Sequence, residues 1–179
     1  MKGPPSDAIL RGLQGLFLDC DGVLTDGRLP YSEEGRRTLN FHARDGFGLA
    51  MLARTEVKIA VISGRGADIA EKRHRELGVE HFIGRSHNKF KAVGELCDEL
   101  AIDPRRVAFV GDDLPDLRAF AACGLKIAVA DAAPEVVEAA DWLLQTPGGG
   151  GAVREVCETL LKARGDWQKT LARLISNPS

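Results

Sequence analysis

The sequence lacks any long apolar segment. Hydrophobic residues make up 44% of the chain, yet no run of them approaches the roughly 20 residues that a membrane-spanning helix needs. The first residues, MKGPPSDAILRGLQG, also lack the apolar centre of a signal peptide. We therefore expect a cytoplasmic protein with no membrane partner.

An excess of charge of either sign is absent as well. The net charge is -2 over 179 residues, so nothing favours binding to nucleic acid or to an anionic membrane. Cysteine is scarce, and the four cysteines form no Cys-x-x-Cys pair and have no histidine at metal-ligand spacing. We expect free thiols in a reducing compartment. The length is enough for one compact domain with a sizeable core.

Short apolar runs, often β-branched, alternate along the chain with longer amphipathic segments. The short runs are typical of buried strands and the longer segments of helices. The predicted strands are 15–19, 57–63, 81–83, 106–112, 125–130 and 141–145. The predicted helices are 45–55, 66–78, 88–100, 114–124, 133–140 and 152–162. This alternation predicts an α/β fold, a Rossmann-like, doubly wound and mainly parallel sheet with helices on both faces.

One segment interrupts the alternation. Residues 25–46 contain two short β-like stretches around the turn-prone sequence SEEG, which predicts a β-hairpin projecting just after the first strand. The chain leaves no room for a cap domain. We expect a single domain over 1–164, followed by a loosely held C-terminal extension over 165–179.

Two aspartates, Asp19 and Asp21, follow directly on the first predicted strand. Carboxylates this close repel each other unless a metal ion, a proton or a cationic ligand neutralises them. Two other predicted strands end in Ser63 and Asp112, and Lys89 opens a predicted helix. Because ligands of doubly wound sheets collect at the carboxyl ends of the strands, we expect these side chains to form one site.

Phosphoryl transfer is the chemistry that needs such a set. Asp19 can attack phosphorus and carry the phosphoryl group. Asp21 can protonate the leaving oxygen and then take a proton from water. Mg²⁺, which prefers oxygen ligands, would bind between Asp19 and Asp112, while Ser63 and Lys89 would hold the phosphoryl oxygens. The metal and the phosphate would then make two close carboxylates tolerable.

At these residues the chain resembles the haloacid dehalogenase superfamily of phosphatases. The four motifs of that superfamily occur in order as DCDGVLTDG, VISGR, the lysine of SHNKF, and VGDDLPD. The segments FHARDGFGL, AVADAAPEV and GGGGAVREV extend the resemblance, over residues 16–161, to the 3-deoxy-D-manno-octulosonate 8-phosphate phosphatases. That family hydrolyses a sugar-acid phosphate during synthesis of the lipopolysaccharide inner core. Its members lack a cap domain and form homotetramers in which a neighbouring subunit helps to close each site.

The resemblance implies a role for each matching residue. Asp19 is expected to be the nucleophile and Asp21 the general acid/base, with Ser63 and Lys89 as further catalytic residues that bind phosphate. The expected Mg²⁺ ligands are Asp19, the main-chain carbonyl of Asp21, and Asp112. The expected substrate-binding residues are Asp21, His42, Ala43, Arg44, Asp45, Gly46, Arg65, Arg73 and Lys89.

Asp113 and Asp116 follow the last motif strand, and one of them is expected to orient Lys89 or a metal-bound water. Either could instead be a favourable negative charge at a helix N-terminus. Simpler explanations also exist for other residues. Ser63 or Asp45 could cap a helix, and Lys89 could be a solvated helix lysine. Arg65 and Arg73 could be surface cations, and His42 could lie at a subunit contact.

Two positions depart from the family pattern. Gly150 stands where the family commonly has a larger, often basic residue, and His42 stands where it often has a small polar one. Both concern the sugar end of the substrate, so a nonulosonate 9-phosphate remains an alternative substrate. A non-catalytic binding or regulatory module is an alternative of another class, although Asp21, whose loss would be the clearest sign of one, is present. A phosphomutase would need a cap to exclude water, which this chain lacks.

Overall fold

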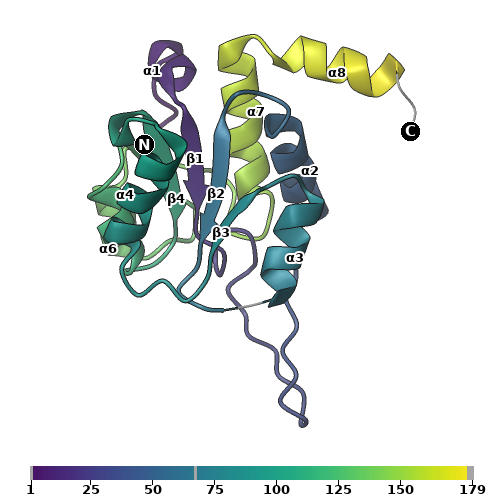
Figure 1. The fold of residues 1–179 in the computed structure, drawn as a ribbon, viewed down its shortest axis with the longest axis vertical. Coiled ribbons are helices and arrows are strands. Elements are labelled where there is room, and N and C mark those ends of the chain that lie inside the picture. Colours follow the sequence, from purple (N-terminus) through teal and green to yellow (C-terminus); the bar gives the residue numbers. More distant parts are fainter. Residues whose placement is uncertain (1, 67, 177–179) are drawn as a thin grey trace.

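The protein, seen in a computed structural model that describes residues 2–66 and 68–176, is built on one six-stranded parallel sheet (Figure 1). The strands lie in the order β3-β2-β1-β4-β5-β6. In chain order they are β1 (Gly15–Leu18), β2 (Lys58–Ile62), β3 (His81–Ile83), β4 (Val107–Gly111), β5 (Leu125–Ala128) and β6 (Trp142–Leu143). Every predicted strand is therefore present, and the predicted doubly wound parallel sheet is confirmed.

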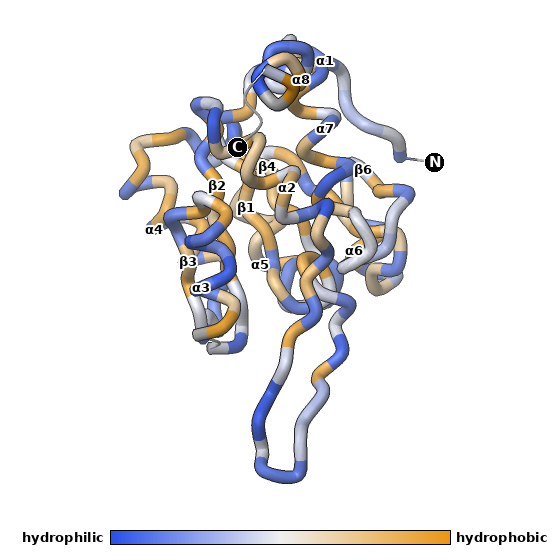
Figure 2. Tube along the Cα trace, turned by 90° about the vertical axis from the view of Figure 1, so that its right-hand side faces the viewer, coloured by the Kyte–Doolittle hydropathy of each residue, from blue (hydrophilic) through white to orange (hydrophobic). Residues whose placement is uncertain are grey.

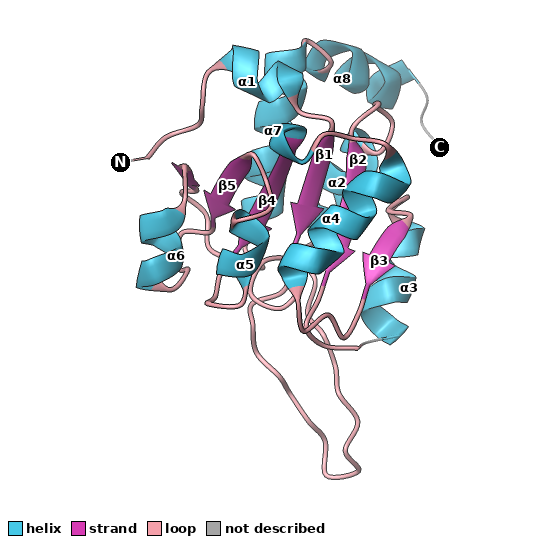
Figure 3. Cartoon of the chain, turned by 60° about the vertical axis from the view of Figure 1, so that its left-hand side comes forward, coloured by secondary structure: helices cyan, strands magenta, loops and turns pink. Residues whose placement is uncertain are grey.

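Helices cover both faces of this sheet (Figure 3). They are α1 (Asp7–Gly12), α2 (Ala43–Leu52), α3 (Asp68–Glu76), α4 (Lys89–Leu100), α5 (Asp116–Phe120), α6 (Pro134–Ala139), α7 (Ala152–Arg164) and α8 (Trp167–Ser176), with a 3-10 helix at Pro104–Arg106. The sequence did not predict α1. Elsewhere the observed ends differ by a few residues from the predicted ones, and Pro134 occupies the first helical position of α6 as expected.

The core consists of two apolar layers, one on each side of the sheet. Leu16 and Leu18 of β1 pack on one side with residues of α1, α2, α3 and α7. Phe17, between them in the sequence, packs on the other side with residues of α4, α5 and α6. Successive side chains of a strand point to opposite faces, so a strand buried on both sides must be apolar throughout. This explains the uninterrupted apolar runs of the sequence.

The register of the sheet places the strand ends at one edge. Leu18, the last residue of β1, pairs with Val61 of β2 and with Val110 of β4. β1 ends at this level, whereas β2 and β4 each continue for one more residue, so the three strands end close together at one edge. Asp19 and Ser63 both continue the pairing, since their N–H groups donate to the carbonyls of Val110 (3.0 Å) and Ile83 (2.8 Å).

The segment between β1 and α2 forms the long projection below the sheet in Figure 2. Its two arms run antiparallel and touch at two isolated bridges, Thr25 with Phe41 and Tyr31 with Arg37. The predicted hairpin is thus confirmed in its course, but its arms form no regular strands. Pro30 has no N–H to donate, and the arms lie away from the sheet that would otherwise pair with them.

After α7 the chain continues into α8, so the predicted extension is helical over Trp167–Ser176. Trp167 packs against the edge of the core, and Lys162 Nζ lies 5.0 Å from the centre of its ring. The domain boundary at residue 164 and the loose attachment of the extension stay predictions. Of the helices in 2–66 and 68–176, none is long and apolar enough to cross a membrane.

All four cysteines are free thiols, as predicted. Cys20, Cys97 and Cys157 are buried, and Cys123 is half-buried. Burial raises the pKa of each of these thiols, to about 11 for Cys97 and about 12 for Cys123. The thiols are therefore packing groups and not reactive nucleophiles.

Candidate active site

A cavity of about 250 Å³ opens at the carboxyl edge of the sheet. Its lining residues follow the ends of β1, β2 and β4, open α4 and α5, or lie at the base of the hairpin: Asp19, Asp21, Gly27, Gly64, Arg65, Lys89, Asp112, Asp113, Pro115 and Asp116. The sequence predicted that these motifs would meet, and the structure brings them together. Ser63, the remaining motif residue, is buried where β2 ends, and its Oγ accepts the N–H of Arg65 at 3.1 Å.

Lys89 occupies the centre of the polar cluster. Its Nζ lies 2.7 Å from Asp19 Oδ1 and 2.5 Å from Asp116 Oδ1, and only 4% of the residue is exposed. It is the first residue of α4, whose preceding residue Asn88 caps the helix by accepting the N–H of Lys91. Lys89 therefore points inward and is not the solvated helix lysine that was the simpler explanation.

Asp116, the first residue of α5, holds both Lys89 and the loop that follows β4. Its Oδ2 accepts the N–H groups of Asp112 (2.9 Å) and Asp113 (3.3 Å), while Oδ1 faces Lys89. Asp116 is 1% exposed, whereas Asp113 is exposed. Of the two aspartates expected to orient Lys89, Asp116 is the one in contact with it.

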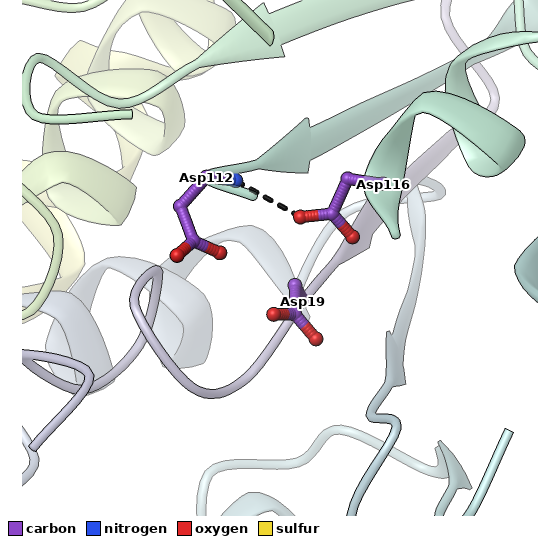
Figure 4. A group of neighbouring side chains, drawn as sticks. All are labelled: Asp19, Asp112 and Asp116. Atoms are coloured by element: carbon purple, nitrogen blue, oxygen red, sulfur yellow. Dashed lines mark hydrogen bonds between the residues drawn. The ribbon is translucent and has the colours of Figure 1, made fainter. Parts of the chain in front are cut away.

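Three carboxylates, those of Asp19, Asp112 and Asp116, lie near one another at the carboxyl edge of the sheet (Figure 4). One oxygen each from Asp19, Asp112 and Asp116 lies within 4.8 Å of the other two. Burial, followed by the charge of Asp116, raises the pKa of Asp19 to about 6 although Lys89 opposes the shift. Burial and the charges of Asp19 and Asp116 raise the pKa of Asp112 to about 8. Burial would lower the pKa of Lys89, yet the two carboxylates beside it raise the value above its usual range.

This cluster fits a hard divalent cation. Asp112 Oδ1 is buried and has no hydrogen-bond partner in the described part of the chain. A carboxylate oxygen left in that state is costly unless a ligand completes it. The main-chain carbonyl of Asp21 accepts no backbone N–H within 2–66 and 68–176. Two carboxylates and this carbonyl supply oxygen ligands, which Mg²⁺ prefers.

Asp21 lies at the more open side of the cavity, with 18% of its side chain exposed. Its Oδ2 is 3.9 Å from Arg65 Nε. Arg65 is itself half exposed, at 51% of its side chain, so this pair is screened by water. Both side chains can therefore reach a bound molecule without breaking a buried contact.

Arg65 lines the cavity as predicted, but the other residues predicted for the sugar end lie elsewhere in the chain's own fold. His42, Ala43, Arg44, Asp45, Gly46 and Arg73 do not line the cavity around Asp19. His42 is the N-cap of α2, and its Nδ1 is 4.0 Å from Asp45 Oδ2. Arg73 pairs with Glu76 at 3.3 Å on α3, close to Gly46.

Asp45 has a structural partner that the sequence did not predict. Its carboxylate accepts the N–H groups of Arg154 (2.7 Å) and Gly151 (3.2 Å), so it caps the start of α7. The expectation that it could cap its own helix is wrong, because His42 holds that position. Burial raises the pKa of Asp45 even though these backbone groups oppose the shift.

Three lining residues were not among the predicted site residues: Gly27, Gly64 and Pro115. Each lies within one of the motifs DCDGVLTDG, VISGR and VGDDLPD, so membership of a motif was the available signal. Gly27 lies at the base of the hairpin and comes to the cavity because the chain turns back after β1.

Comparisons with known proteins agree with this fold and site. The family model for haloacid dehalogenase-like hydrolases matches residues 73–155. The 3-deoxy-D-manno-octulosonate 8-phosphate phosphatase KdsC of Escherichia coli K12 is 40% identical over 166 residues, covering 91% of this chain and 88% of that protein. The corresponding protein of Haemophilus influenzae is 41% identical over 156 residues, covering 87% of each chain.

Solved structures are similar over nearly the whole chain. The phosphatase of this name from Moraxella catarrhalis, in complex with a magnesium ion, a phosphate ion and a KDO molecule, has a TM-score of 0.90 at 34% identity, covering 94% of this chain and 97% of that one. The cobalt-bound form of the Haemophilus influenzae phosphatase has a TM-score of 0.87 at 38% identity, covering 92% and 99%.

The parallel sheet and the aspartate-lysine cluster at its carboxyl edge define the class of protein, a haloacid dehalogenase-like hydrolase. With 40% identity over 91% of its length, the chain belongs to the family of 3-deoxy-D-manno-octulosonate 8-phosphate phosphatases.

Proposed function

We propose that this protein is a Mg²⁺-dependent phosphatase that hydrolyses 3-deoxy-D-manno-octulosonate 8-phosphate to the free sugar acid and phosphate, in the synthesis of the lipopolysaccharide inner core. The observation that carries the proposal is the buried Lys89, held between Asp19 and Asp116, together with an Asp112 oxygen that has no hydrogen-bond partner among the described residues. Supporting it are the relatives of that name, which match the chain over nine-tenths of its length.

Asp19 acts as the nucleophile in this proposal. Its attack on phosphorus forms an aspartyl phosphate and releases the sugar alkoxide, which Asp21 protonates. Asp21 then takes a proton from the water that hydrolyses the aspartyl phosphate. Asp21 is exposed enough to exchange protons with solvent, and the turn after β1 places it in the same cavity as Asp19.

Lys89 and Ser63 bind the phosphoryl oxygens, where negative charge is concentrated in the transition state. Lys89 is held by Asp116 and therefore needs little reorganisation to face a phosphate. Asp19, Asp112 and the main-chain carbonyl of Asp21 would hold Mg²⁺. When bound, the ion neutralises the carboxylates and the phosphate. Asp19 then remains ionised although burial raises its pKa.

The sugar end requires residues from outside the cavity of one chain. Arg65 faces the cavity, but residues 42–46 and Arg73 do not line it. We propose a homotetramer in which these residues of one subunit complete the site of another. The exposed hairpin, with Tyr31 61% exposed at its bridge, is the surface available for that assembly. We further propose a cytoplasmic location.

The test is phosphate release with Mg²⁺ from three substrates: 3-deoxy-D-manno-octulosonate 8-phosphate, a nonulosonate 9-phosphate and a hexose phosphate. We expect kcat/KM for the eight-carbon acid to exceed the others by about 10²-fold, equal to about 2.7 kcal/mol of transition-state binding. The variant Asp19→Asn serves as the inactive control. Equal, slow release of phosphate from all three substrates would contradict the proposed substrate but would still be consistent with the hydrolase mechanism. Activity of Asp19→Asn equal to wild type would disprove the mechanism.

A further inference from the structure

The turn that follows Asp19 carries Asp21 and rests on Asp112. We call residues 20–26 the catalytic turn. Within it the main-chain carbonyl of Cys20 accepts the N–H groups of Leu24 (3.0 Å) and Thr25 (3.1 Å). Gly22 has a φ of +98°, and a Cβ atom there would lie 2.0 Å from Asp112 Oδ2. The backbone of the turn and the carboxylate of Asp112 are therefore in direct contact.

On its other side the catalytic turn is backed by residues 147–151, which we call the glycine segment. The N–H of Gly149 donates to the carbonyl of Val23 at 2.9 Å. A Cβ atom on Gly148 would lie 1.6 Å from the carbonyl oxygen of Gly22, and one on Gly149 would lie 2.4 Å from the backbone of Thr25. Because no side chain separates the two backbones, a shift of the glycine segment must displace Gly22.

Asp131 ties the glycine segment back to Asp112. Its Oδ1 accepts the N–H of Gly148 at 2.8 Å. Asp131 belongs to the loop after β5, and in that loop the N–H of Ala133 donates to the main-chain carbonyl of Asp112 at 2.7 Å. The contacts thus form a closed ring. It runs from the main chain of Asp112 to the loop after β5, from Asp131 in that loop to Gly148, from Gly148 to Gly22, and from Gly22 back to the carboxylate of Asp112.

We infer that Asp131 is a positioning residue for the hydrolysis of the phosphate ester. Through the glycine segment, Asp131 sets the distance between Asp112 and the catalytic turn. Asp131 is exposed and does not line the cavity of its own chain, so it does not contact a molecule bound beside Asp19 there. It acts on the relative position of Asp112 and the main-chain carbonyl of Asp21. Since these are proposed Mg²⁺ ligands, loss of Asp131 lowers metal affinity. The inference rests on the proposed hydrolase chemistry but not on the identity of the sugar.

The experiment compares Asp131→Ala and Asp131→Asn with a matched control, Asp141→Ala. Asp141 is also exposed, and its Oδ2 also accepts a backbone N–H, that of Lys126 at 3.0 Å, but away from the cavity. Mg²⁺ is titrated calorimetrically into each metal-free protein to give Kd. Turnover of p-nitrophenyl phosphate, which needs no sugar recognition, gives kcat, KM and the half-saturating Mg²⁺ concentration. Thermal unfolding reports any loss of stability.

We expect Asp131→Ala to weaken Mg²⁺ binding about 10-fold, the usual effect of removing a group that supports a metal ligand. Its kcat falls while KM changes little. Asp131→Asn keeps an oxygen that can accept the Gly148 N–H, so it should recover most of the affinity. Asp141→Ala should bind Mg²⁺ like wild type, whatever its Tm.

Three results would overturn the inference: Mg²⁺ affinity and kcat of Asp131→Ala equal to wild type, an Asn variant as weak as the Ala variant, or the same loss in Asp141→Ala. Failure of the proposed function would look different. A wild-type protein that binds Mg²⁺ but releases no phosphate from any substrate would contradict the function, and calorimetry alone would then still report on Asp131.

Discussion

Lys89 and Asp116 form a buried ion pair, with Nζ 2.5 Å from Oδ1, at the point where the starts of α4 and α5 meet. The second oxygen of Asp116 binds the backbone after β4. One carboxylate thus fixes a cation and a loop at once. Removing it leaves Asp19 as the carboxylate partner of Lys89 within the described residues, and it frees the loop that carries Asp112.

The variant Asp116→Ala should therefore lose turnover by about 10²-fold, since it disturbs a charge aimed at the phosphoryl group. Steady-state kinetics with and without excess Mg²⁺ measure the effect. Asp98→Ala is the control, because Asp98 is an exposed aspartate of α4 that does not line the cavity. A loss in Asp98→Ala as large as that in Asp116→Ala would contradict the role given to the ion pair.

The stability of the metal-free protein should fall as pH rises from 6.5 to 8.5. Asp112 has a pKa of about 8 in the folded protein, against 3.8 as its ordinary value. The folded state therefore binds more protons than the unfolded state in this window, and the free energy of unfolding decreases as the pH increases. Mg²⁺ replaces those protons, so its stabilising effect should grow with pH.

Thermal unfolding in chelator and in Mg²⁺, at both ends of that window, checks this expectation. Asp112→Asn removes the titrating group and should flatten the profile in chelator. Stabilisation by Mg²⁺ that is the same at pH 6.5 and pH 8.5 would show that Asp112 does not exchange a proton for the metal.

His74 should make the protein sensitive to acid. It is 1% exposed, stacked on Phe82 (centroids 5.5 Å apart) and edge-on to Phe41 at the base of the hairpin (5.8 Å). Burial lowers its pKa from 6.5 to about 4. At this residue the unfolded state binds more protons between these pH values, so the contribution of His74 to the free energy of unfolding falls as pH drops, by roughly 2–3 kcal/mol at pH 4.5.

Urea unfolding at pH 7 and pH 4.5 measures this difference. His74→Phe keeps an aromatic ring between Phe41 and Phe82 but cannot be protonated, and it should lose most of the acid sensitivity. His87→Asn, at an exposed position, is the control and should behave like wild type. If His74→Phe and wild type lose the same stability between pH 7 and pH 4.5, titratable groups other than His74 cause the acid sensitivity.

Arg85 is held in a conformation that suits glycine. Its φ is +58°, in the exposed loop between β3 and α4. A left-handed conformation costs a residue with a side chain about 1–2 kcal/mol, and glycine avoids this cost. Glycine also has greater freedom in the unfolded chain, which favours unfolding and cancels part of the gain. Arg85→Gly should therefore stabilise the protein by about 0.5–1 kcal/mol, seen as a Tm increase of about 1–4 °C.

The control is Arg118→Gly, an exposed arginine inside α5, where glycine should destabilise the helix by about 1 kcal/mol. Differential scanning calorimetry compares the two variants with wild type. A lower Tm for Arg85→Gly would mean that contacts of the arginine side chain outweigh the backbone strain.

The sequence by itself determined the sheet and the place of the site. Apolar runs such as 15–18 and 107–111 can be recognised as strands because each strand is buried on both faces. A parallel sheet must then bring the residues that follow these strands, Asp19 and Asp112, to one edge. Those are consequences of local pattern and of strand direction, which neighbouring residues specify.

Only the tertiary structure decided which polar groups meet. Asp116 binds Lys89 across 27 positions of the sequence, and the carboxylate of Asp45 binds the N–H of Arg154, 109 positions away. The approach of Gly148 to Gly22 has no signal in either segment. A hydrogen bond or a backbone contact needs placement to within a few tenths of an ångström, and the packing of whole helices on the sheet sets that placement.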